Sequence, residues 1–351
     1  MNPFRIALGA TLALVAAPSQ ADPRTLDVLP SMTWQHARTG LTMPPYLGSL
    51  PRNEVGDFGT VEADLFLQYR GADGTEATIY VFHPGVDSVP LWFDRVQAAI
   101  VARGKFGTIG DAQATAFAVR PGAPATALRV TYPLKGSAFL ATAAAAVPVA
   151  DWLVVVRLSS TSKDAAAVDA ELTAVVNGIG WPADKLEAPV AAPIKPCGTM
   201  PSFHKAKLIK PDMMQALVGA AVSGAVATDR KDANDHRASI PTYCRAQQAA
   251  DAAWGVYRVE GEERGYVLAL GDDGRAIGVQ PSLAALVNKT KPAYSLAYMD
   301  LTEWRIYPDV SDQLPPEQAL DIVDHTNPIA SADTLSGKGS ITINSAVTEK
   351  K

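Results

Sequence analysis

The sequence predicts an α+β protein of two domains, and three observations support this. Apolar residues alternate with polar ones in many short segments, which is typical of half-buried strands, and only a few segments show helical spacing. A proline-rich stretch, 183–196, divides the chain into two parts. A chain of 351 residues is long enough for two cores. We expect domains at 22–182 and 197–326, a semi-rigid linker at 183–196 and a flexible tail at 327–351.

The first 21 residues have the pattern of a cleaved secretory signal peptide. Arg5 gives a positive start, Ile6 to Ala17 gives an apolar core, and Ser19-Gln20-Ala21 places small residues where signal peptidase cuts. The apolar run is too short to stay in a bilayer as a spanning helix, and no cysteine follows it to carry a lipid. We therefore expect cleavage after Ala21 and a soluble mature protein that is periplasmic or secreted.

The first domain is expected to begin with antiparallel strands. Residues Trp34 to Gly48 are typical of a strand interrupted by a turn at Gly40-Leu41. A second strand follows from its alternation of apolar residues, namely Val61, Ala63, Leu65, Leu67 and Tyr69. Gly71 to Gly74 supplies turn residues, and the β-branched and aromatic residues of Ala77 to Phe82 predict the returning strand of a hairpin.

A helix is expected next, over Leu91 to Arg103, because Asp87 or Ser88 can cap it and Pro90 suits its first turn. A second helix is expected over Asp164 to Val176, from its amphipathic spacing. Between the helices the sequence predicts further strands at Ala114 to Val119, Ala125 to Leu134, Ala138 to Val147 and Trp152 to Leu158.

The segment Ala138 to Val156 contains a single formal charge, Asp151, so it could be either a membrane span or a pair of buried strands. A membrane span would place Asp151 and Pro148 inside hydrocarbon, which is energetically costly. Two buried strands joined by a turn at Pro148 to Asp151 explain the same residues without this cost. We therefore expect no integral membrane segment in the mature chain.

The order of these elements resembles the Mog1/PsbP family of α+β sandwiches over Asp27 to Pro182. The residues behind the resemblance are Thr39 to Pro44, similar to the Gly-hydrophobic-x-hydrophobic-Pro start of that fold, the hairpin turn at Gly71 to Gly74, and the strand and helix that lead to Trp181. The resemblance implies a PsbP-like antiparallel sheet with flanking helices. It also implies a binding or assembly role without a catalytic set of residues.

The second domain is expected to start with a helix after Pro211-Asp212. Its apolar side consists of Met214, Leu217, Val218, Ala221, Val222, Ala225 and Val226. Gly219, Ser223 and Gly224 would let another element approach this helix closely. Expected strands follow at Thr242 to Ala246, Trp254 to Glu260, Tyr266 to Leu270, Arg275 to Val279, Ala293 to Leu301 and Glu303 to Tyr307. Asp272-Asp273-Gly274 is a strong hairpin turn. Short helices are expected after Ser282 and from Pro315-Pro316-Glu317 to His325.

Cys197 and Cys244 are the two cysteines, and in an oxidising compartment an isolated pair is expected to form a structural disulfide. A redox pair is disfavoured because the spacing is not C-x-x-C, and a metal site is disfavoured because no further ligands are spaced to help. The net charge of −5 and the lack of a basic block exclude nucleic acid as an expected partner, and make anionic lipid headgroups an unexpected one.

The sequence contains a few isolated, partial matches to catalytic and metal-binding motifs. Ser160 with Lys163 and Ser202 with Lys205 match S-x-x-K, but neither pair begins a helix as a serine acyl enzyme requires. Asp232 to His236 resembles a calcium loop without the glycine and the closing glutamate. The final helix places Asp321, Asp324 and His325 on one face.

Two further groups remain as candidates for binding. His83, at a strand end near Asp87 and Asp94, could bind a ligand, perform acid/base work or simply hydrogen-bond the turn. Six aromatic residues could line a concave surface of the second domain or form its core: Trp254, Tyr257, Tyr266, Tyr294, Tyr298 and Trp304.

The sequence thus favours an exported, soluble, non-catalytic binding or assembly factor, without catalytic residues, metal or cofactor. Its partner is expected to be a protein or small molecule of the cell envelope, which the residues do not identify. The alternative is an exported hydrolase whose site is assembled from distant residues such as His83, His204 or His236. A site of this kind would bring a histidine, a carboxylate and a serine or metal ligand into hydrogen-bond reach.

Overall fold

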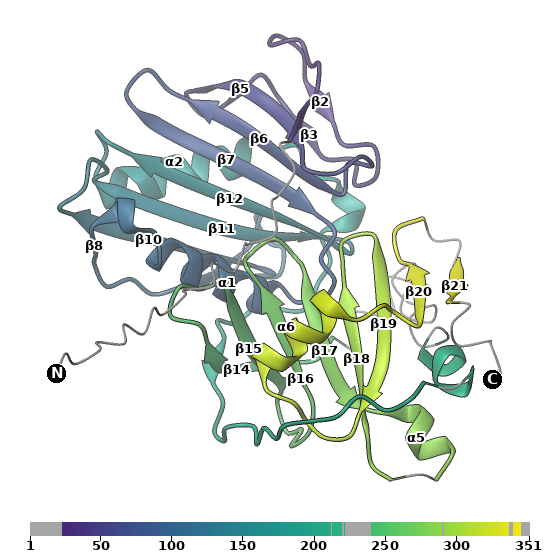
Figure 1. The fold of residues 1–351 in the computed structure, drawn as a ribbon. Coiled ribbons are helices and arrows are strands. Elements are labelled where there is room, and N and C mark those ends of the chain that lie inside the picture. The colour runs from purple at the N-terminus through teal and green to yellow at the C-terminus, as the bar shows by residue number, and fades with distance from the viewer. Residues whose placement is uncertain are drawn as a thin grey trace, which may run out of the picture.

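The computed structural model describes residues 23–211, 213–219, 221, 240–289, 291–336 and 340–344, and within them the protein is a mixed α+β fold. Its strands lie mainly in two large sheets, one of ten strands and one of nine (Figure 1). The expected signal peptide, residues 1–21, and the calcium-like loop at 232–236 lie outside the described residues. The α+β class expected from the sequence is confirmed.

The first sheet is antiparallel throughout and has the order β1-β5-β6-β7-β12-β11-β10-β8, with β4 and β9 paired at its edges. Its strands are β1 (Arg24–Thr25), β4 (Tyr46–Leu47), β5 (Leu50–Asp57), β6 (Asp64–Arg70), β7 (Thr75–Phe82), β8 (Thr108–Ile109), β9 (Thr115–Phe117), β10 (Ala127–Lys135), β11 (Ala141–Val149) and β12 (Trp152–Ser160). The hairpin expected at Gly71 to Gly74 joins β6 and β7.

The start of this sheet differs from the expected one. Residues 34–48 form only short pieces, among them the two-residue pair β2 (Trp34–Gln35) and β3 (Thr42–Met43), and the long strand is β5, which the sequence pattern did not reveal. Strand β5 carries Pro51 and three charged residues, and its burial alternates only in its first half. Pairing with β6 on one side and with β1 and β4 on the other makes it a strand despite this composition.

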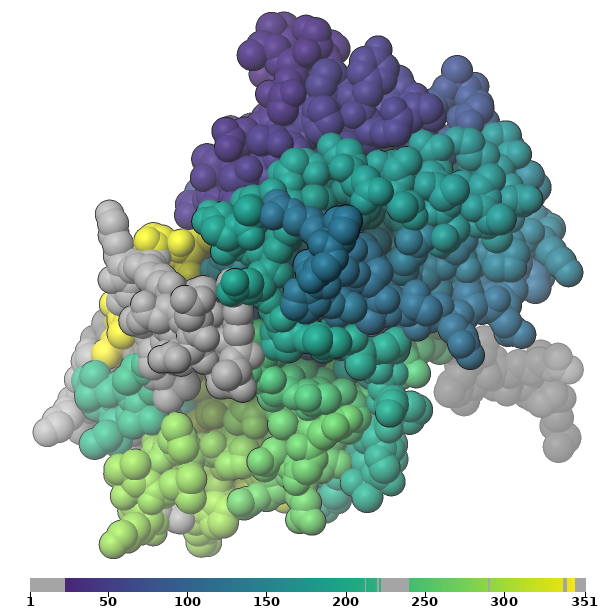
Figure 2. Space-filling view, turned by 180° about the vertical axis from the view of Figure 1, so that it is seen from behind, coloured from purple at the N-terminus to yellow at the C-terminus, as the bar shows by residue number. Residues whose placement is uncertain are grey.

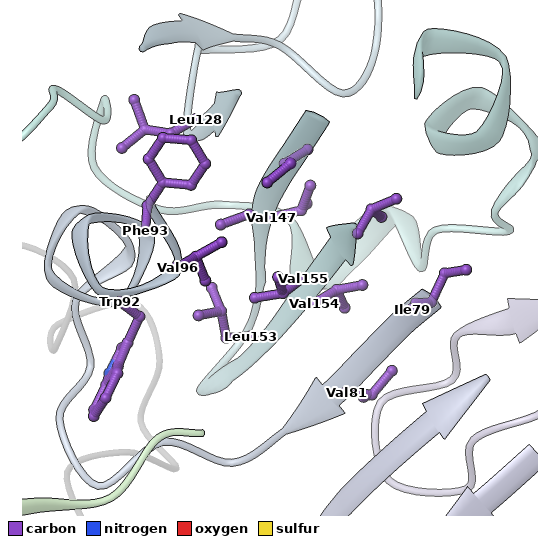
Figure 3. Close-up of a cluster of buried hydrophobic side chains, with 14 of the residues drawn as sticks. Ile79, Val81, Trp92, Phe93, Val96, Leu128, Val147, Leu153, Val154 and Val155 are labelled. Atoms are coloured by element: carbon purple, nitrogen blue, oxygen red, sulfur yellow. The ribbon is translucent and has the colours of Figure 1, made fainter. Parts of the chain in front are cut away.

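Two helices pack on the first sheet, α1 (Val89–Val101) and α2 (Ala165–Gly178). The first sheet with these helices, residues 24–178, is called the first unit. Ser88 caps α1, as expected, and Asp164, expected as the first residue of its helix, caps α2; each accepts a hydrogen bond from a backbone N–H in the first turn. All nine residues of β11 are buried, and both helices contact this strand. Figure 3 shows Phe93 and Val96 of α1 beside Val147, Leu153 and Val155, with Val154 on the opposite face of β12.

The low-charge segment 138–156 is therefore the hairpin of β11 and β12 and not a membrane span. Pro148, expected in the turn, lies inside β11 opposite Leu153, and the turn falls at Ala150 and Asp151. Ala150 has a φ of +54°, in the left-handed region that such a tight turn requires. Among the described residues, no helix is both long and apolar enough to cross a membrane.

The second sheet follows the chain order from β13 to β21. Its strands are β13 (Lys195–Pro196), β14 (Tyr243–Gln248), β15 (Trp254–Val259), β16 (Tyr266–Leu270), β17 (Ala276–Pro281), β18 (Tyr294–Met299), β19 (Glu303–Val310), β20 (Ala330–Asp333) and β21 (Ile341–Ile343). The disulfide between Cys197 and Cys244 is confirmed, and it holds the end of the 183–196 segment beside β14. Helices α5 (Leu283–Val287) and α6 (Pro316–His325) follow β17 and β19.

Two expectations for this half need correction. In helix 213–219, Met214 and Leu217 were expected to be buried, but their side chains are 43% and 48% exposed, and Gln215 and Ala216 are buried instead. The reason is that Gln215 donates hydrogen bonds to β19. The tail expected to be loose from residue 327 contains β20 and β21, which extend the sheet beyond β19.

A continuous apolar cluster joins the two sheets. It contains Phe82 and Trp92 from the first unit and Tyr257, Ala276 and Met299 from the second. A separate cluster fills the space between the second sheet and α6. The second sheet thus uses one face for α6 and part of the other face for contact with the first unit, and the division into two domains stays a prediction.

Polar contacts cross the same junction. Arg95, whose side chain is fully buried, donates hydrogen bonds to the carbonyls of Gly271 and Ala252. The Gly85 N–H donates to the Gly274 carbonyl at 2.8 Å. A Cβ atom at Gly85 would lie 2.6 Å from the Met299 carbonyl oxygen, so the loop after β7 approaches the second sheet as closely as glycine permits.

Candidate functional site

A cavity of about 380 Å³ lies on the face of the second sheet that is turned away from α6. Its floor comes from neighbouring strands β16 to β19, because cross-strand partners point to the same side of a sheet. Gly278 pairs with Ala297, and Ala297 pairs with Ile306. Other described residues of this floor are Val267, Gln280, Ser295, Met299 and Trp304.

Small side chains at the centre of the floor create the space. Gly278, Ser295 and Ala297 are small residues in strand positions, where larger β-branched or aromatic residues are the usual choice. A Cβ atom added at Gly278 would meet only the flexible end of Met299 within 3.4 Å. The larger side chains of Met299, Trp304 and Ile306 stand around this centre.

Segments far apart in sequence form the walls. The loop Gly85 to Asp87 comes from the first unit, helix 213–219 contributes Gln215, Val218 and Gly219, and α5 contributes Leu283 and Ala284. Gly219 lets its helix lie close to β19, because a Cβ atom there would be 2.8 Å from Ile306. The site therefore exists only when both sheets and both helices are in place.

A second cavity of about 270 Å³ lies next to the first and shares Asp87, Ile240, Pro241 and Tyr243 with it. It is lined by the proline-rich residues 187–195 and by Asp151 at the turn after β11. The segment 183–196 is thus packed against the rest of the protein over part of its length, with Ala191 5% exposed.

The polar end of the first cavity is formed by three side chains that bind one another. Ser282 donates its hydroxyl hydrogen to Oδ2 of Asp309, and Gln215 donates from Nε2 to Oδ1 of Asp309 at 2.9 Å. Ser282 also caps α5 by accepting a hydrogen bond from the Ala285 N–H at 3.1 Å. These contacts attach both wall helices to the end of β19.

Trp304 adds a polar atom of a different kind. Its indole Nε1 is buried and has no hydrogen-bond partner within the described part of the chain. A buried donor without a partner costs about 1–3 kcal/mol, so the few that occur in native proteins call for an explanation. Because Trp304 lines the cavity, an acceptor atom on a bound molecule is one way to satisfy it.

The charge of the lining restricts what can bind. The described lining residues include the two carboxyl groups of Asp87 and Asp309 and no lysine, arginine or histidine. A free carboxylate or phosphate inside the cavity would find no cationic partner among these described residues, and burial of an unpaired charge is costly. The lining therefore suits an uncharged and mainly apolar molecule.

Of the six aromatic residues considered from the sequence, Trp304 is the one among the cavity's described lining residues. Tyr257 lies in the cluster at the junction of the sheets, and the other four belong to the cluster under α6 or pack against it: Trp254, Tyr266, Tyr294 and Tyr298. Their role as ordinary core is thus the correct interpretation for most of them. The strand register decides this, since it sends neighbouring aromatics to opposite faces.

His83 is buried at the end of β7, where Nδ1 lies 2.8 Å from the Leu301 carbonyl and Nε2 lies 3.1 Å from Oδ2 of Asp151. A carbonyl oxygen can only accept, so Nδ1 donates to Leu301. Both ring nitrogens are therefore engaged, and neither is placed to take a proton from a nucleophile. Asp94, the carboxylate considered with His83, instead binds Arg245 and Tyr257 across the junction.

The other described histidines lie elsewhere. His204 and His325 are exposed, and each is beside a carboxylate, Asp312 at 3.5 Å and Asp321 at 3.2 Å. His36 is buried between Thr39 and the Glu62 carbonyl, and burial lowers the pKa of its ring to about 4. His236 lies outside the described residues. The structure does not bring His83 and His204 to a common site with a serine.

The S-x-x-K pairs do not have the geometry of a catalytic dyad. Ser160 is fully buried, and its Oγ accepts hydrogen bonds from the backbone N–H groups of Ser162 and Lys163. The Lys163 ammonium binds Asp73 and Glu171. Ser202 lies in an irregular segment, not at a helix start. In the described part of the chain, no three histidine, cysteine or acidic side chains are grouped as metal ligands would be.

The sequence contained a weak indication of the cavity that periodicity did not bring out. Gly278, Ser295 and Ala297 interrupt strands that are otherwise rich in large apolar residues, and small residues inside a strand often mark close approach or open space. Their common location required the register of three strands. Comparison with family models, with curated proteins and with solved structures found no match to this chain.

Proposed function

We propose that the chain is an exported, non-catalytic binding protein, and that the 380 Å³ cavity holds a small, mainly apolar and uncharged molecule. The cavity is the observation that carries the proposal. Its volume falls in the range of about 300–1,000 Å³ that is usual for small-molecule sites, and such sites are frequent where two structural units meet. The expected division into two domains, with a PsbP-like first domain, belongs to this proposal.

The chemistry of the lining supports a binding role over an acyl-transfer role. Ser282 is placed near a carboxylate, but its hydroxyl serves as a helix cap and as a donor to Asp309, and no histidine is among the described lining residues. Trp304 Nε1 is a donor available to a carbonyl or ether oxygen of the bound molecule. The proposed ligand therefore has an apolar body and at least one hydrogen-bond acceptor.

The binding proposal is tested with N-phenyl-1-naphthylamine, an uncharged dye that fluoresces in apolar surroundings. The mature protein is expected to raise its fluorescence with a saturable dependence on protein concentration. Ala297→Leu fills the centre of the cavity floor, so that the naphthyl ring of the dye can no longer contact the apolar lining. This substitution is expected to weaken dye binding at least about tenfold. Ala170→Leu, on the exposed side of α2, is the matched control and should leave binding unchanged.

Equal dye affinity in the wild type and in Ala297→Leu would refute the cavity as the binding site. Hydrolysis of fluorogenic esters by the mature protein, abolished by Ser282→Ala, would replace the binding role with the hydrolase alternative. Export is tested separately by mass spectrometry of the protein recovered from its native cells. The expected N-terminal residue is Asp22, and an intact Met1 would refute cleavage.

A further inference from the structure

The outer surface beside the cavity carries an unusual concentration of exposed apolar side chains. We call it the apolar rim, and it consists of Leu208, Ile209, Met213, Met214 and Leu217 on one segment and Leu283, Leu286 and Val287 on α5. Their exposed fractions run from 39% at Ile209 to 66% at Leu286. Single exposed leucines are ordinary, whereas neighbouring ones mark contact surfaces.

The two parts of the rim belong to one region of the molecule. Helix 213–219 and α5 both line the cavity, through Val218 and Gly219 on one side and Leu283 on the other. Residue 209 is tied to the end of β19 by the hydrogen bond from the Ile209 N–H to the Asp309 carbonyl at 2.7 Å. The space-filling view shows the teal helix segment directly beside the yellow-green residues around α5 (Figure 2).

Lysines lie on both segments that carry the rim, and the nearest acidic residues in sequence are Asp212, two residues after Lys210, and Asp300. Residues 203–211 contain Lys205, Lys207 and Lys210, residues 282–299 contain Lys289 and Lys291, and neither segment contains an aspartate or glutamate. All five lysines are exposed. Within the described part of the chain none of them forms an ion pair. The two segments that carry the rim are therefore positively charged at these five positions, although the net charge of the whole chain is −5.

This combination distinguishes between kinds of partner. Interfaces between proteins are enriched in aromatic residues, arginine and methionine and are depleted in lysine. The rim has two methionines, Met213 and Met214, but no aromatic residue and no arginine, and its segments carry five exposed lysines. A second copy of the chain would bring like-charged lysines together across a two-fold axis. A bilayer interface instead accepts aliphatic side chains between its headgroups and attracts lysines when those headgroups are anionic.

We infer that the apolar rim docks on a lipid bilayer that contains anionic headgroups, with Leu286 and Val287 inserted and Lys207, Lys210, Lys289 and Lys291 on the headgroup phosphates. The docking does not depend on the proposed ligand, because Leu286, Val287 and the lysines lie outside the cavity, and Leu283 is the rim residue that also lines it. It is a peripheral attachment and requires no membrane-spanning segment.

The test is co-sedimentation of the mature protein with vesicles of phosphatidylcholine alone and with vesicles that also contain phosphatidylglycerol. The protein is expected to bind the anionic vesicles and to be released by salt. Leu286→Ser with Val287→Ser is expected to weaken binding at least about tenfold. Each of Lys207→Gln, Lys210→Gln, Lys289→Gln and Lys291→Gln is expected to weaken it about fivefold, which corresponds to about 1 kcal/mol per lysine near the surface.

Leu140→Ser and Lys135→Gln, both at exposed positions of the first unit, are the matched controls and should not change vesicle binding. Failure to sediment with either vesicle, or equal loss in the controls, would overturn the inference. So would a wild-type dimer that the Leu286 and Val287 changes convert to a monomer, because the rim would then be a self-association surface. Dye binding separates the two proposals: rim variants should keep it, and Ala297→Leu should keep vesicle binding.

Discussion

Asp94 on α1 connects the two sheets through two hydrogen bonds to residues of the second sheet. Its side chain is 7% exposed, and it accepts hydrogen bonds from Arg245 at 2.7 Å and from the Tyr257 hydroxyl at 2.7 Å. Burial, with the neighbouring Asp94 charge, raises the pKa of Tyr257, so this hydroxyl keeps its proton and acts as the donor. Asp94→Ala removes the acceptor and leaves both donors without it.

The expected cost follows from the burial of the three groups. A hydrogen bond to a charged group contributes about 1.5–3 kcal/mol, and removal of one partner of a buried pair costs about 3–5 kcal/mol. Arg245 is 33% exposed at its side chain and can recover some solvation, which reduces the loss. We therefore expect Asp94→Ala to lower the free energy of unfolding by about 3 kcal/mol.

The assay is urea unfolding followed by tryptophan fluorescence and by far-ultraviolet circular dichroism. With a slope of about 3 kcal/mol per molar urea, the midpoint should fall by about 1 M. The matched control is Glu76→Ala, which removes a carboxylate from an exposed pair with Arg70 and should cost well below about 1 kcal/mol. Equal midpoints for Asp94→Ala and wild type, or a change seen by one probe alone, would refute a shared and cooperative junction.

Three further predictions concern the turn, the disulfide and the response to pH. At Gly274 the backbone φ is +91°, and the Cβ atom added by Gly274→Ala would lie 2.7 Å from Phe82 and 2.9 Å from Leu301. At Gly122 the backbone φ is +77°, and the Cβ atom added by Gly122→Ala would meet open space. Thermal melts should show the first to be more destabilising, by about 1–3 kcal/mol, and equal costs would contradict the packing described for the junction. Replacement of Cys197 and Cys244 by serine should lower stability by up to roughly 4 kcal/mol, from closure of a loop with a sequence separation of 47, and urea unfolding that matches the wild type would oppose this. Burial raises the pKa of the Asp64 carboxyl from 3.8 to about 6. The contribution of this carboxyl to folding stability is therefore fully present below its unfolded pKa of 3.8 and is lost as the pH rises through about 6. Burial lowers the pKa of His36 from 6.5 to about 4, and its contribution is present above 6.5 and lost as pH falls through about 4. Melts of Asp64→Asn between about pH 7 and about pH 4 should therefore show a steeper loss of stability on acidification than wild type, and parallel curves would exclude the Asp64 contribution.

Local patterns predicted much of the secondary structure because their causes are local. Ser88, Asp164 and Ser282 cap helices where their side chains reach the first-turn N–H groups, and Gly74 and Gly274 supply the positive φ of two hairpin turns. Strand β5 was not predicted, because Pro51 and the charged residues of this strand interrupt the alternation of apolar and polar side chains. Pro148 is expected in a turn because proline is uncommon inside strands, but it lies in β11 and the chain turns at Ala150 and Asp151.

The site depended on distances that no local pattern encodes. The expected apolar face of helix 213–219 was wrong at Met214 and Leu217, because the hydrogen bonds of Gln215 to β19 determine which face of the helix is buried. The six aromatic residues could not be assigned to one face before the register was known. His83 acquired its partners Leu301 and Asp151 from segments far away in the chain.

By itself the sequence determined the α+β class, the capped helices, the tight hairpins and the cysteine pair, since each follows from residues within a few positions or from the count of thiols. The tertiary structure decided the cavity, the burial of Asp94 and the exposure of the apolar rim. The physical reason is that a side chain's direction in a strand depends on its register with its neighbours. Gly278, Ala297 and Ile306 share one face only because three strands pair in that register.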